Sequence, residues 1–266
     1  MTSAYHSPSP TSSASRSFET PLVDLDALDV GEGLRYALVI DEPKSALPAD
    51  VAAYVSWGES YDPSRDDLGR KTSAFPSSVS DRGVAWYDLT PALRRGDVLP
   101  MKNVDARHVY WVPKRPTWID DRLHGIEIPG GDTNRGFVAG VLNSTYGTLA
   151  CEVNGRVNLG QGALDVATDD HRRTLVPPLD SVDEELKGRI AAQFERLGER
   201  PVDSIFAELG TSEPSEVTFD AIAGDRLALD RLVVQDLLGF DADTQREVYR
   251  GTLALVGQRI EKADTG

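Results

Sequence analysis

The segment KNVDARHVYWVPKRPTW, residues 102–118, alternates cationic side chains with large aromatic rings. The cations are Lys102, Arg107, Lys114 and Arg115, and the rings are Tyr110, Trp111 and Trp118. Arg and Lys bind phosphates and guanine edges, and aromatic rings stack on bases. Trp86 and Tyr87 add a second aromatic pair close to Arg82. These residue types indicate a surface for a polyanion such as DNA, although a protein core with a charged rim would use the same residues.

The loop Gly160-Gln161-Gly162 is the first candidate for a cofactor site. A dinucleotide loop needs its glycines between a strand and a helix N-terminus, where backbone N–H groups reach the phosphates. Here the loop follows NGRVNL, and no βαβ alternation surrounds it. The segment LGRKTS at 68–73 lacks the first glycine of a phosphate loop. We therefore expect no bound cofactor in this chain, and interpret Gly160–Gly162 as a turn that lines a binding surface.

Other residues with chemical potential do not form a catalytic or metal-binding pattern. The four histidines, at positions 6, 108, 124 and 171, lack metal-ligand spacing, and there is no Gly-x-Ser-x-Gly elbow. The pairs Asp120-Asp121 and Asp169-Asp170 are expected on a solvated surface. Cys151 is the single cysteine, which excludes an internal disulfide and argues against a thiolate zinc site. We expect Cys151 in the core.

The composition is typical of an acidic protein that is adapted to a high salt concentration. The 266 residues carry a net charge of −15, 28 of the 43 acids are Asp, and 22 of the 28 bases are Arg. Such charge keeps a protein soluble by self-repulsion, so we predict a halophilic source. Between Arg82 and Arg173, however, 12 Lys and Arg meet 11 Asp and Glu. This nearly neutral middle is where a polyanion would be tolerated.

The positions of turn residues and apolar runs predict an α+β fold: a mixed domain followed by a small helical C-terminal region. Residues 1–20 are rich in Ser and Pro and are predicted to be a disordered tail. Residues 21–180 hold strand candidates at His108–Val112 and His124–Ile128, and a helix predicted over 134–149. No apolar run spans a bilayer and no secretory signal is visible, so we expect a cytoplasmic protein.

Residues 181–266 read as helices beyond the boundary Pro177-Pro178. Ser181 and Glu184 suggest a capping box ahead of an amphipathic pattern, and Thr244 and Glu247 suggest another. The apolar faces expected from the spacing are Leu186, Ile190, Phe194 and Leu197 in the first of these helices, and Val248, Tyr249, Leu253, Val256 and Ile260 in the last.

Six segments in order resemble the C-terminal, target-recognition half of adenine-specific DNA methyltransferases of restriction-modification systems. They are YVSWGE, WYDL, DRLHGI, GFVAGVLNST, NGRVNLGQGAL and LVPPLD, and the resemblance covers roughly residues 50–262. It implies that this chain binds double-stranded DNA. It also implies a separate methyltransferase or restriction chain as partner, which would carry S-adenosylmethionine.

The chain departs from that family where catalysis would occur. Family members carry a Phe-x-Gly-x-Gly loop for S-adenosylmethionine and an Asn-Pro-Pro-Tyr/Phe motif that holds the flipped adenine. Neither occurs here: LVPPLD has Val176 in place of the Asn and Leu179 in place of the aromatic residue. We therefore expect no catalytic residue, no cofactor-binding residue and no metal ligand in this chain, which would not methylate DNA alone.

The predicted DNA-binding residues come from the cationic and aromatic segment and from the positions that match the family's motifs. They are Trp86, Tyr87, Lys102, Arg107, Lys114, Arg115, Arg122, His124, Asn143, Ser144, Asn154, Arg156 and Gln161. Two alternatives remain open: an acidic interaction subunit that docks on the catalytic chain without reading DNA, and an unrelated enzyme whose site the sequence does not reveal.

Overall fold

The computed structural model describes residues 7–10, 18–24, 34–37, 39–60, 85–88, 90, 93–115, 117–119, 123–157 and 162–264. The strands are β1 (Ser7–Pro10), β2 (Leu22–Val23), β3 (Leu34–Ala37), β4 (Arg94–Gly96), β5 (Asn103–Val104), β6 (Val112–Pro113), β7 (Thr117–Ile119) and β8 (Leu164–Asp165). The α-helices are α2 (Ala49–Ser60), α4 (Asp132–Asn143), α5 (Thr145–Asn154), α6 (Thr168–Arg172), α7 (Glu184–Gly198), α8 (Ile205–Leu209), α9 (Gly224–Asp230) and α10 (Ala242–Asp264). The remaining helical segments are η2 (Lys44–Ala46), η6 (Leu179–Ser181), η7 (Pro214–Glu216), η8 (Phe219–Ala221) and the π-helical η9 (Arg231–Leu237).

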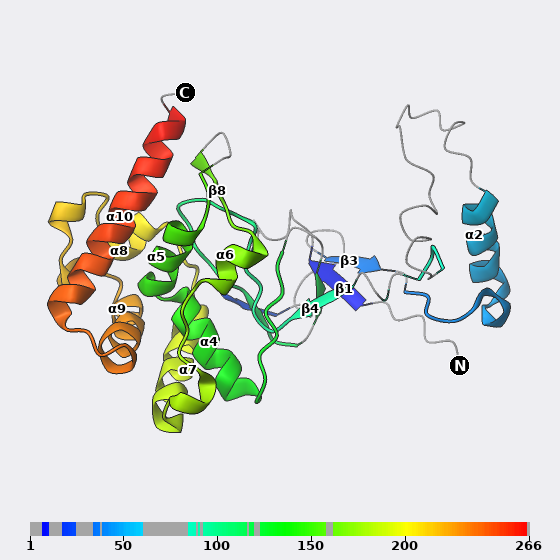
Figure 1. Ribbon diagram of the computed structural model, residues 1–266, viewed down its shortest axis with the longest axis horizontal. Helices are drawn as coiled ribbons and strands as arrows, with labels where there is room; N and C mark the ends of the chain where they lie inside the picture. The colour runs from blue at the N-terminus through cyan, green and yellow to red at the C-terminus, as the bar shows by residue number, and fades with distance from the viewer. Residues whose placement is uncertain are drawn as a thin grey trace.

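The architecture is α+β, with short strand pairs followed by a helical C-terminal region, as predicted. The pairs are β1–β3, β4–β7 and β5–β8, which are antiparallel, and β2–β6, which is parallel. Figure 1 shows β1, β3 and β4 between α2 at one end of the molecule and the packed helices at the other, whereas β8 lies among the helices. Single bridges such as Val98–Ile126 and Leu99–Trp111 join the pairs.

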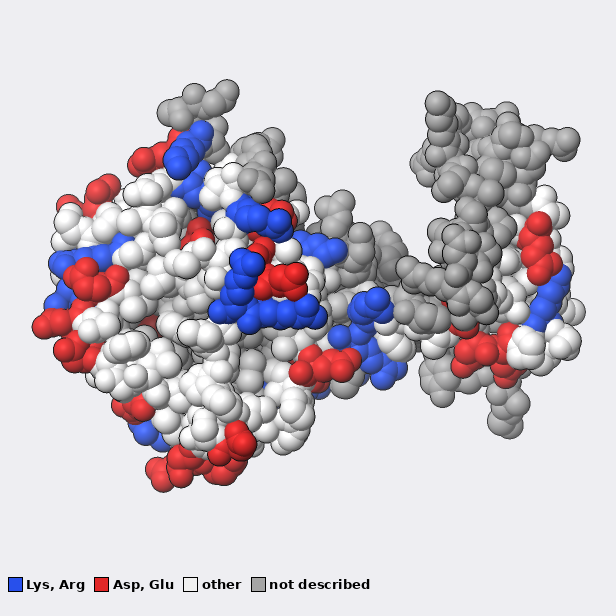
Figure 2. Space-filling view, viewed as in Figure 1, with Lys and Arg blue, Asp and Glu red and all other residues white. Residues whose placement is uncertain are grey.

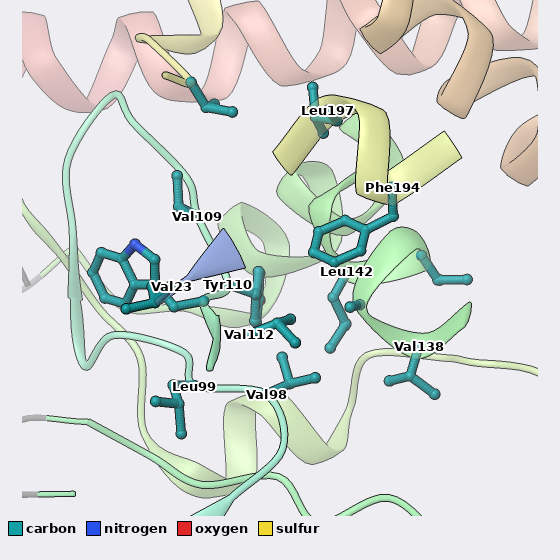
Figure 3. Packing of buried hydrophobic residues seen from close by; sticks show 14 of the residues in the cluster. Val23, Val98, Leu99, Val109, Tyr110, Val112, Val138, Leu142, Phe194 and Leu197 are labelled. Carbon is teal, nitrogen blue, oxygen red and sulfur yellow. The ribbon is translucent and has the colours of Figure 1, made fainter. Parts of the chain in front are cut away.

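One hydrophobic core joins the strand-rich segment to the first C-terminal helix. Phe194 of α7 lies beside Leu142 of α4, with Val98 and Val112 close by (Figure 3), and Leu197 belongs to the same cluster. The helices α4 and α7 pack closely because α4 has glycines where they meet. A Cβ at Gly140 would lie 2.6 Å from Cγ2 of Ile190. The predicted boundary at Pro177-Pro178 therefore separates a strand-rich segment from a helical one, and the two segments share one hydrophobic core.

Buried ion pairs fix the C-terminal helices on that core. Glu208, which is 3% exposed, accepts hydrogen bonds from Arg200 at 2.7 and 2.8 Å and from Arg226 at 3.3 Å. The guanidinium of Arg226 also donates to the carbonyl of Asn143. Asp230 accepts from the backbone N–H and the hydroxyl of Thr145, each at 2.7 Å. Because a buried charge is tolerated only when it is paired, these contacts specify how α8 and α9 meet α5.

The predicted helix over 134–149 is two helices. Ser144 has extended backbone angles and its Oγ accepts from the N–H of Gly147, so it ends α4 and caps α5. Further along, the predicted capping pair at Ser181 and Glu184 is wrong, since Asp183 caps α7 instead. The expected apolar face of α7 is confirmed: Ile190, Phe194 and Leu197 are buried.

The predicted strands are shorter than the sequence suggested. Within the part of the chain that the structure describes, Trp111 and Val112 are the residues of His108–Val112 that form β-bridges or strand pairs. In His124–Ile128, Ile126 bridges Val98, and the N–H of His124 donates to the carbonyl of Pro100 at 3.0 Å. Residues 108–112 are nevertheless all buried. Within the segment predicted as a tail, Ser7–Pro10 pairs with β3 and the ring of Phe18 packs edge-on against Trp111. Residues 1–6 and 11–17 lie outside the described residues.

Candidate nucleic-acid interface

The ribbon of β4 and β7 presents the adjacent arginines Arg94 and Arg95 to solvent. Arg95 pairs with Trp118 in the register of the ribbon, and its guanidinium lies 3.9 Å from the centre of the Trp118 ring. This cation–π contact orients the planar cation and leaves its in-plane N–H groups available. A two-stranded ribbon is narrow enough to enter the DNA major groove. The geometry thus suits contact with phosphates or base edges.

The motif His124-Gly125 connects this ribbon to β8 and α6. A Cβ at Gly125 would lie 2.1 Å from the carbonyl oxygen of Arg95, so only glycine permits the close approach. His124 places Nε2 3.1 Å from the carbonyl of Val166 and Nδ1 3.2 Å from the hydroxyl of Thr168. Burial lowers the pKa of His124, an effect that the Val166 carbonyl partly opposes. His124 is therefore a neutral positioning group whose two ring nitrogens are both engaged.

Exposed arginines flank β8 and α6. The side chain of Arg156 is 51% exposed and lies 3.6 Å from Asp165 and 3.5 Å from Asp170. Arg173 lies 3.6 Å from Asp170, and Arg172 lies 2.8 Å from Asp169. Figure 2 shows Lys and Arg gathered over α6 and again near β4, with acids between them. Because an exposed ion pair contributes little stability, an incoming phosphate could replace Asp169 beside Arg172. Asp170 is buried and accepts from the N–H of Ala167 at 2.9 Å, so it belongs to the fold.

Two predicted contact residues are instead part of the protein interior. The amide of Asn143, which is 4% exposed, accepts from the N–H of Tyr110 at 3.0 Å and donates to the carbonyls of Tyr110 and Ala139. Ser144 is fully buried as the cap of α5. Both side chains are buried and form hydrogen bonds within the protein, so neither lies on the candidate interface.

Predicted cations on the 102–118 segment face different directions. Arg107 donates to the carbonyl of Phe18, and burial lowers its pKa despite the nearby charges of Glu19 and Asp203. Lys114 is exposed and pairs with Asp24 at 2.8 Å. These two residues therefore contact the segment around β2. Arg115 is exposed at the end of β6, while Lys102, half-buried, lies close enough to His124 to lower its pKa.

The remaining predicted residues are divided among three places. Trp86 lies on Gly58 of α2, with its ring centroid 5.9 Å from Tyr54 and 6.0 Å from Tyr87. Asn154 is half-buried at the end of α5, near Arg156. Arg122 and Gln161 lie outside the described residues. The structure thus brings together His124 and Arg156, and leaves Trp86 and Tyr87 with α2.

Sequence reasoning missed four exposed arginines on the two elements that contact His124-Gly125, which are β4 and α6. They are Arg94 and Arg95 on β4, and Arg172 and Arg173 at the end of α6. The available signal was their occurrence as Arg-Arg doublets within the nearly neutral middle of the chain. Nothing in the doublets themselves indicates that two segments so far apart in the sequence both lie next to His124-Gly125.

The described end of the glycine loop is held by the last helix. Gly162 adopts a φ of 73°, a conformation that favours glycine, and its carbonyl accepts from Arg259 of α10. Arg259 also donates to Glu152 at 2.7 and 3.1 Å, and Nε2 of His108 lies 2.8 Å from the same carboxylate. Despite burial, these partners lower the pKa of Glu152. The described end of the loop is thus fixed by a buried ionic cluster.

Cys151 lies in the core, as predicted. It is 2% exposed, and burial raises its pKa to about 12. Within the described ranges, no group of three or more His, Cys, Asp or Glu side chains is arranged to hold a metal ion. Among the same residues, no helix combines the length and apolar character that a membrane span requires.

Comparisons with known proteins give one partial sequence match and one structural match. No family model matches the chain. It is 27% identical over 120 residues to the ribosome maturation factor RimM of Synechococcus sp. (strain JA-2-3B'a(2-13)), which covers 40% of this chain and 67% of that protein. In three dimensions the chain is similar to the type IIG restriction endonuclease BpuSI, with a TM-score of 0.58 at 12% identity. That similarity covers 99% of this chain and 27% of the endonuclease.

The structural similarity shows a shared fold. It includes the strand-rich segment and the C-terminal helices together, since almost the whole chain is covered. The chain spans about a quarter of the length of the endonuclease that it matches. The match to the ribosome maturation factor involves less than half of this chain.

Proposed function

We propose that this chain recognises a DNA target for an adenine-specific methyltransferase or restriction-modification system. The observation that carries the proposal is the fold shared with a type IIG restriction endonuclease over 99% of the chain. The ordered motifs of a methyltransferase's target-recognition half, and the absence of the family's catalytic motifs from the sequence, agree with it. A separate chain would then supply S-adenosylmethionine and the methylation or cleavage chemistry.

The interface in this proposal is the face that carries β4, β8 and α6. The exposed doublets at 94–95 and 172–173, together with Arg156, would bind phosphates and orient the duplex, as side chains of this type do in other DNA complexes. Trp118 orients Arg95, Asp165 and Asp170 hold Arg156, and Asp169 and Asp170 hold Arg172 and Arg173. Because the rest of the molecule is acidic, this face is the part of the described surface best suited to a polyanion.

Fluorescence anisotropy of the full chain with a panel of labelled duplexes tests this proposal. We expect a sequence preference that survives molar KCl, because base contacts persist where phosphate attraction is screened. The double variant Arg94→Ala/Arg95→Ala should weaken binding and reduce the salt slope by about 0.9 for each phosphate that the protein no longer neutralises. Equal affinity for every duplex, with the catalytic partner also present, would refute the proposal.

A matched control is available on the far helix α10. Arg246→Ala/Arg250→Ala removes the same two positive charges from i,i+3 ion pairs with Asp243 and Glu247. It should leave DNA affinity nearly unchanged if the effect of the Arg94/Arg95 variant is local. Double-stranded RNA of equal length, used as a competitor, distinguishes DNA recognition from a general affinity for duplexes, a distinction prompted by the partial match to a ribosome maturation factor.

A second candidate function is an acidic subunit that docks on a methyltransferase or nuclease chain without reading DNA. The exposed aromatic pair on α2 favours it: Tyr54 and Trp57 are 43% and 52% exposed and stack at 5.8 Å. Half-exposed aromatic residues are typical anchors of protein interfaces. In that case Tyr54→Ala/Trp57→Ala would abolish co-purification of a stoichiometric partner, whereas Arg94→Ala/Arg95→Ala would leave the activity of the complex unchanged.

A further inference from the structure

A recess of about 490 Å³ opens beside Arg95. It is lined by Arg95, Gly96, Asp97, Glu127, Ile128 and Pro129. Its two walls are the end of β4 and the segment that precedes α4, joined by hydrogen bonds between the backbones of Val98 and Ile126 at 3.2 and 2.9 Å. The backbone therefore fixes the shape of the recess next to the cation that Trp118 orients.

The walls combine hydrogen-bond acceptors with an apolar surface. One carboxylate oxygen of Asp97 accepts from the N–H of Ile128 at 2.8 Å, which fixes that side chain. Glu127 is exposed, and among the described residues its carboxylate has neither a hydrogen bond nor an ion pair. Ile128 and Pro129 provide an apolar surface. A planar group that donates from one edge would match these walls.

A nucleobase with an exocyclic amino group has this chemistry. Cytosine N4 and adenine N6 are the amino donors of the major groove, and carboxylates accept from cytosine N4 in known complexes. A carboxylate cannot donate, so it opposes the acceptor atoms O6 and N7 of guanine and O4 of thymine. Arg95, which also lines the recess, can bind the adjacent phosphate without competing for the amino group of the base, because a guanidinium only donates.

We propose that this recess reads one base of the DNA target, cytosine or adenine, with Glu127 as the acceptor for its exocyclic amino group and Arg95 on the neighbouring phosphate. The inference rests on the proposed function. It adds that Glu127 determines the specificity at one position of the DNA target. Replacing Glu127 should change the preference at a single position of the target. Replacing Arg95 should weaken binding at every sequence alike.

Selection of bound sequences from a randomised duplex pool, with the full chain in molar KCl, tests the inference. Wild type, Glu127→Ala and Glu185→Ala are compared side by side. Glu185 is an exposed acid in the first turn of α7, so its variant removes the same charge far from the recess. The Glu127→Ala variant should lose discrimination for cytosine or adenine at one position by roughly fivefold to hundredfold. The sequence preference of Glu127→Ala at every other position should equal that of wild type. The preference of Glu185→Ala should equal that of wild type at all positions.

The outcomes separate this inference from the proposed function. A wild-type consensus that Glu127→Ala leaves intact at every position overturns the inference and preserves the proposed function. A wild-type chain that selects no consensus overturns both. Equal melting temperatures of the three proteins, expected because both glutamates are exposed, would show that a lost preference reflects recognition and not unfolding. Arg95→Ala should weaken binding to every sequence and leave the discrimination at that position unchanged, because a guanidinium cannot accept from an amino group. Altered discrimination there would place Arg95 on the base and overturn its assignment to the phosphate.

Discussion

Arg95 has a defined direction because Trp118 lies beneath it. An unsupported arginine on a short edge ribbon would sample many rotamers, and binding would cost the entropy of ordering it. The ring centroid at 3.9 Å limits that freedom before any ligand arrives. The same ring depends on the β4–β7 register, so one residue of strand slip would place Trp118 on the opposite face.

A double-mutant cycle measures this contact without DNA. Arg95→Ala, Trp118→Leu and the double variant are unfolded in urea, and their free energies of unfolding are compared with wild type. We expect a coupling energy of about 0.5–1 kcal/mol, the range of exposed cation–π pairs. Additive effects of the two substitutions would contradict a stabilising stack. Arg94→Ala with Trp118→Leu is the matched control and should be additive, since Arg94 lies opposite Ile119 in the register.

His171 gives the protein a sensitivity to acid. Burial, and next the charge of His124, lower its pKa to about 4, while the carbonyl of Met101 and the charge of Asp170 act in the other direction. Its ring centroid lies 5.3 Å from that of His124 and 5.8 Å from that of Tyr110. Since the folded pKa is below the unfolded value, the unfolded chain binds more protons between these two values. The contribution of His171 to the free energy of unfolding is therefore fully present above about pH 6.5, the ordinary pKa of histidine. It is lost progressively as the pH falls toward the pKa of the folded state.

Urea unfolding at pH 7, 6 and 5 tests this dependence. Wild type should lose about 1–2 kcal/mol more than His171→Gln over this range, because only wild type carries the depressed pKa at this position. Carboxylates that titrate near pH 5 are common to both proteins and cancel in the difference. Parallel pH profiles for the two proteins would rule out His171 as the source of the sensitivity.

At this scale the sequence indicated residue types better than their positions. It found a segment in which cations and rings alternate, yet Arg107 turns to the carbonyl of Phe18 and Asn143 to the backbone of Tyr110. Such directions depend on contacts between segments far apart in the chain, which local pattern does not encode. His124 and Arg156 came together on one face, whereas Arg94 and Arg95 drew no prediction because their exposure depends on pairing with β7.

At the scale of elements, helices with long apolar periodicity were predictable and strands were not. The faces of α7 and α10 follow from residues spaced along one chain segment, and Ile190, Phe194 and Tyr249 are buried as expected. Strands of two or three residues are too short to show the alternation of apolar and polar residues from which a strand is predicted. Capping was misplaced at α7 because Asp183 and Ser181 are both good caps, and tertiary packing decides between them.

The contact between α4 and α7 depends on glycine in the middle of a helix. Gly140→Ala should destabilise the protein by about 1–3 kcal/mol, because the new Cβ would lie 2.6 Å from Ile190 Cγ2 and 3.2 Å from its carbonyl oxygen. Gly188→Ala on α7 is the control, since nothing lies within 4 Å of its added Cβ. It should stabilise by about 0.5–1 kcal/mol through helix propensity. Thermal melting of the two variants should therefore shift in opposite directions, and shifts of the same sign would refute this account of the packing.

At the scale of the whole molecule, the excess negative charge is concentrated outside the middle of the sequence. The net charge of −15 resides outside the segment from Arg82 to Arg173, which carries slightly more bases than acids. Several cations within that segment are already paired with local carboxylates such as Asp165 and Asp170. The excess acids elsewhere repel one another across the surface, and this repulsion acts on the folded state more than on the expanded chain.

Salt should therefore stabilise the protein, and the shape of the dependence reveals why. The Debye length falls from about 10 Å at 0.1 M to about 3 Å at 1 M, so repulsion between surface acids is largely screened by 1 M KCl. The melting temperature should rise steeply below about 0.5 M and level off above about 1 M, following that screening. The same titration in sucrose of matched viscosity should lack the steep early rise. A melting temperature that falls with KCl would mean that the exposed ion pairs contribute more than the net repulsion, and would remove the physical ground for expecting a salt-adapted protein.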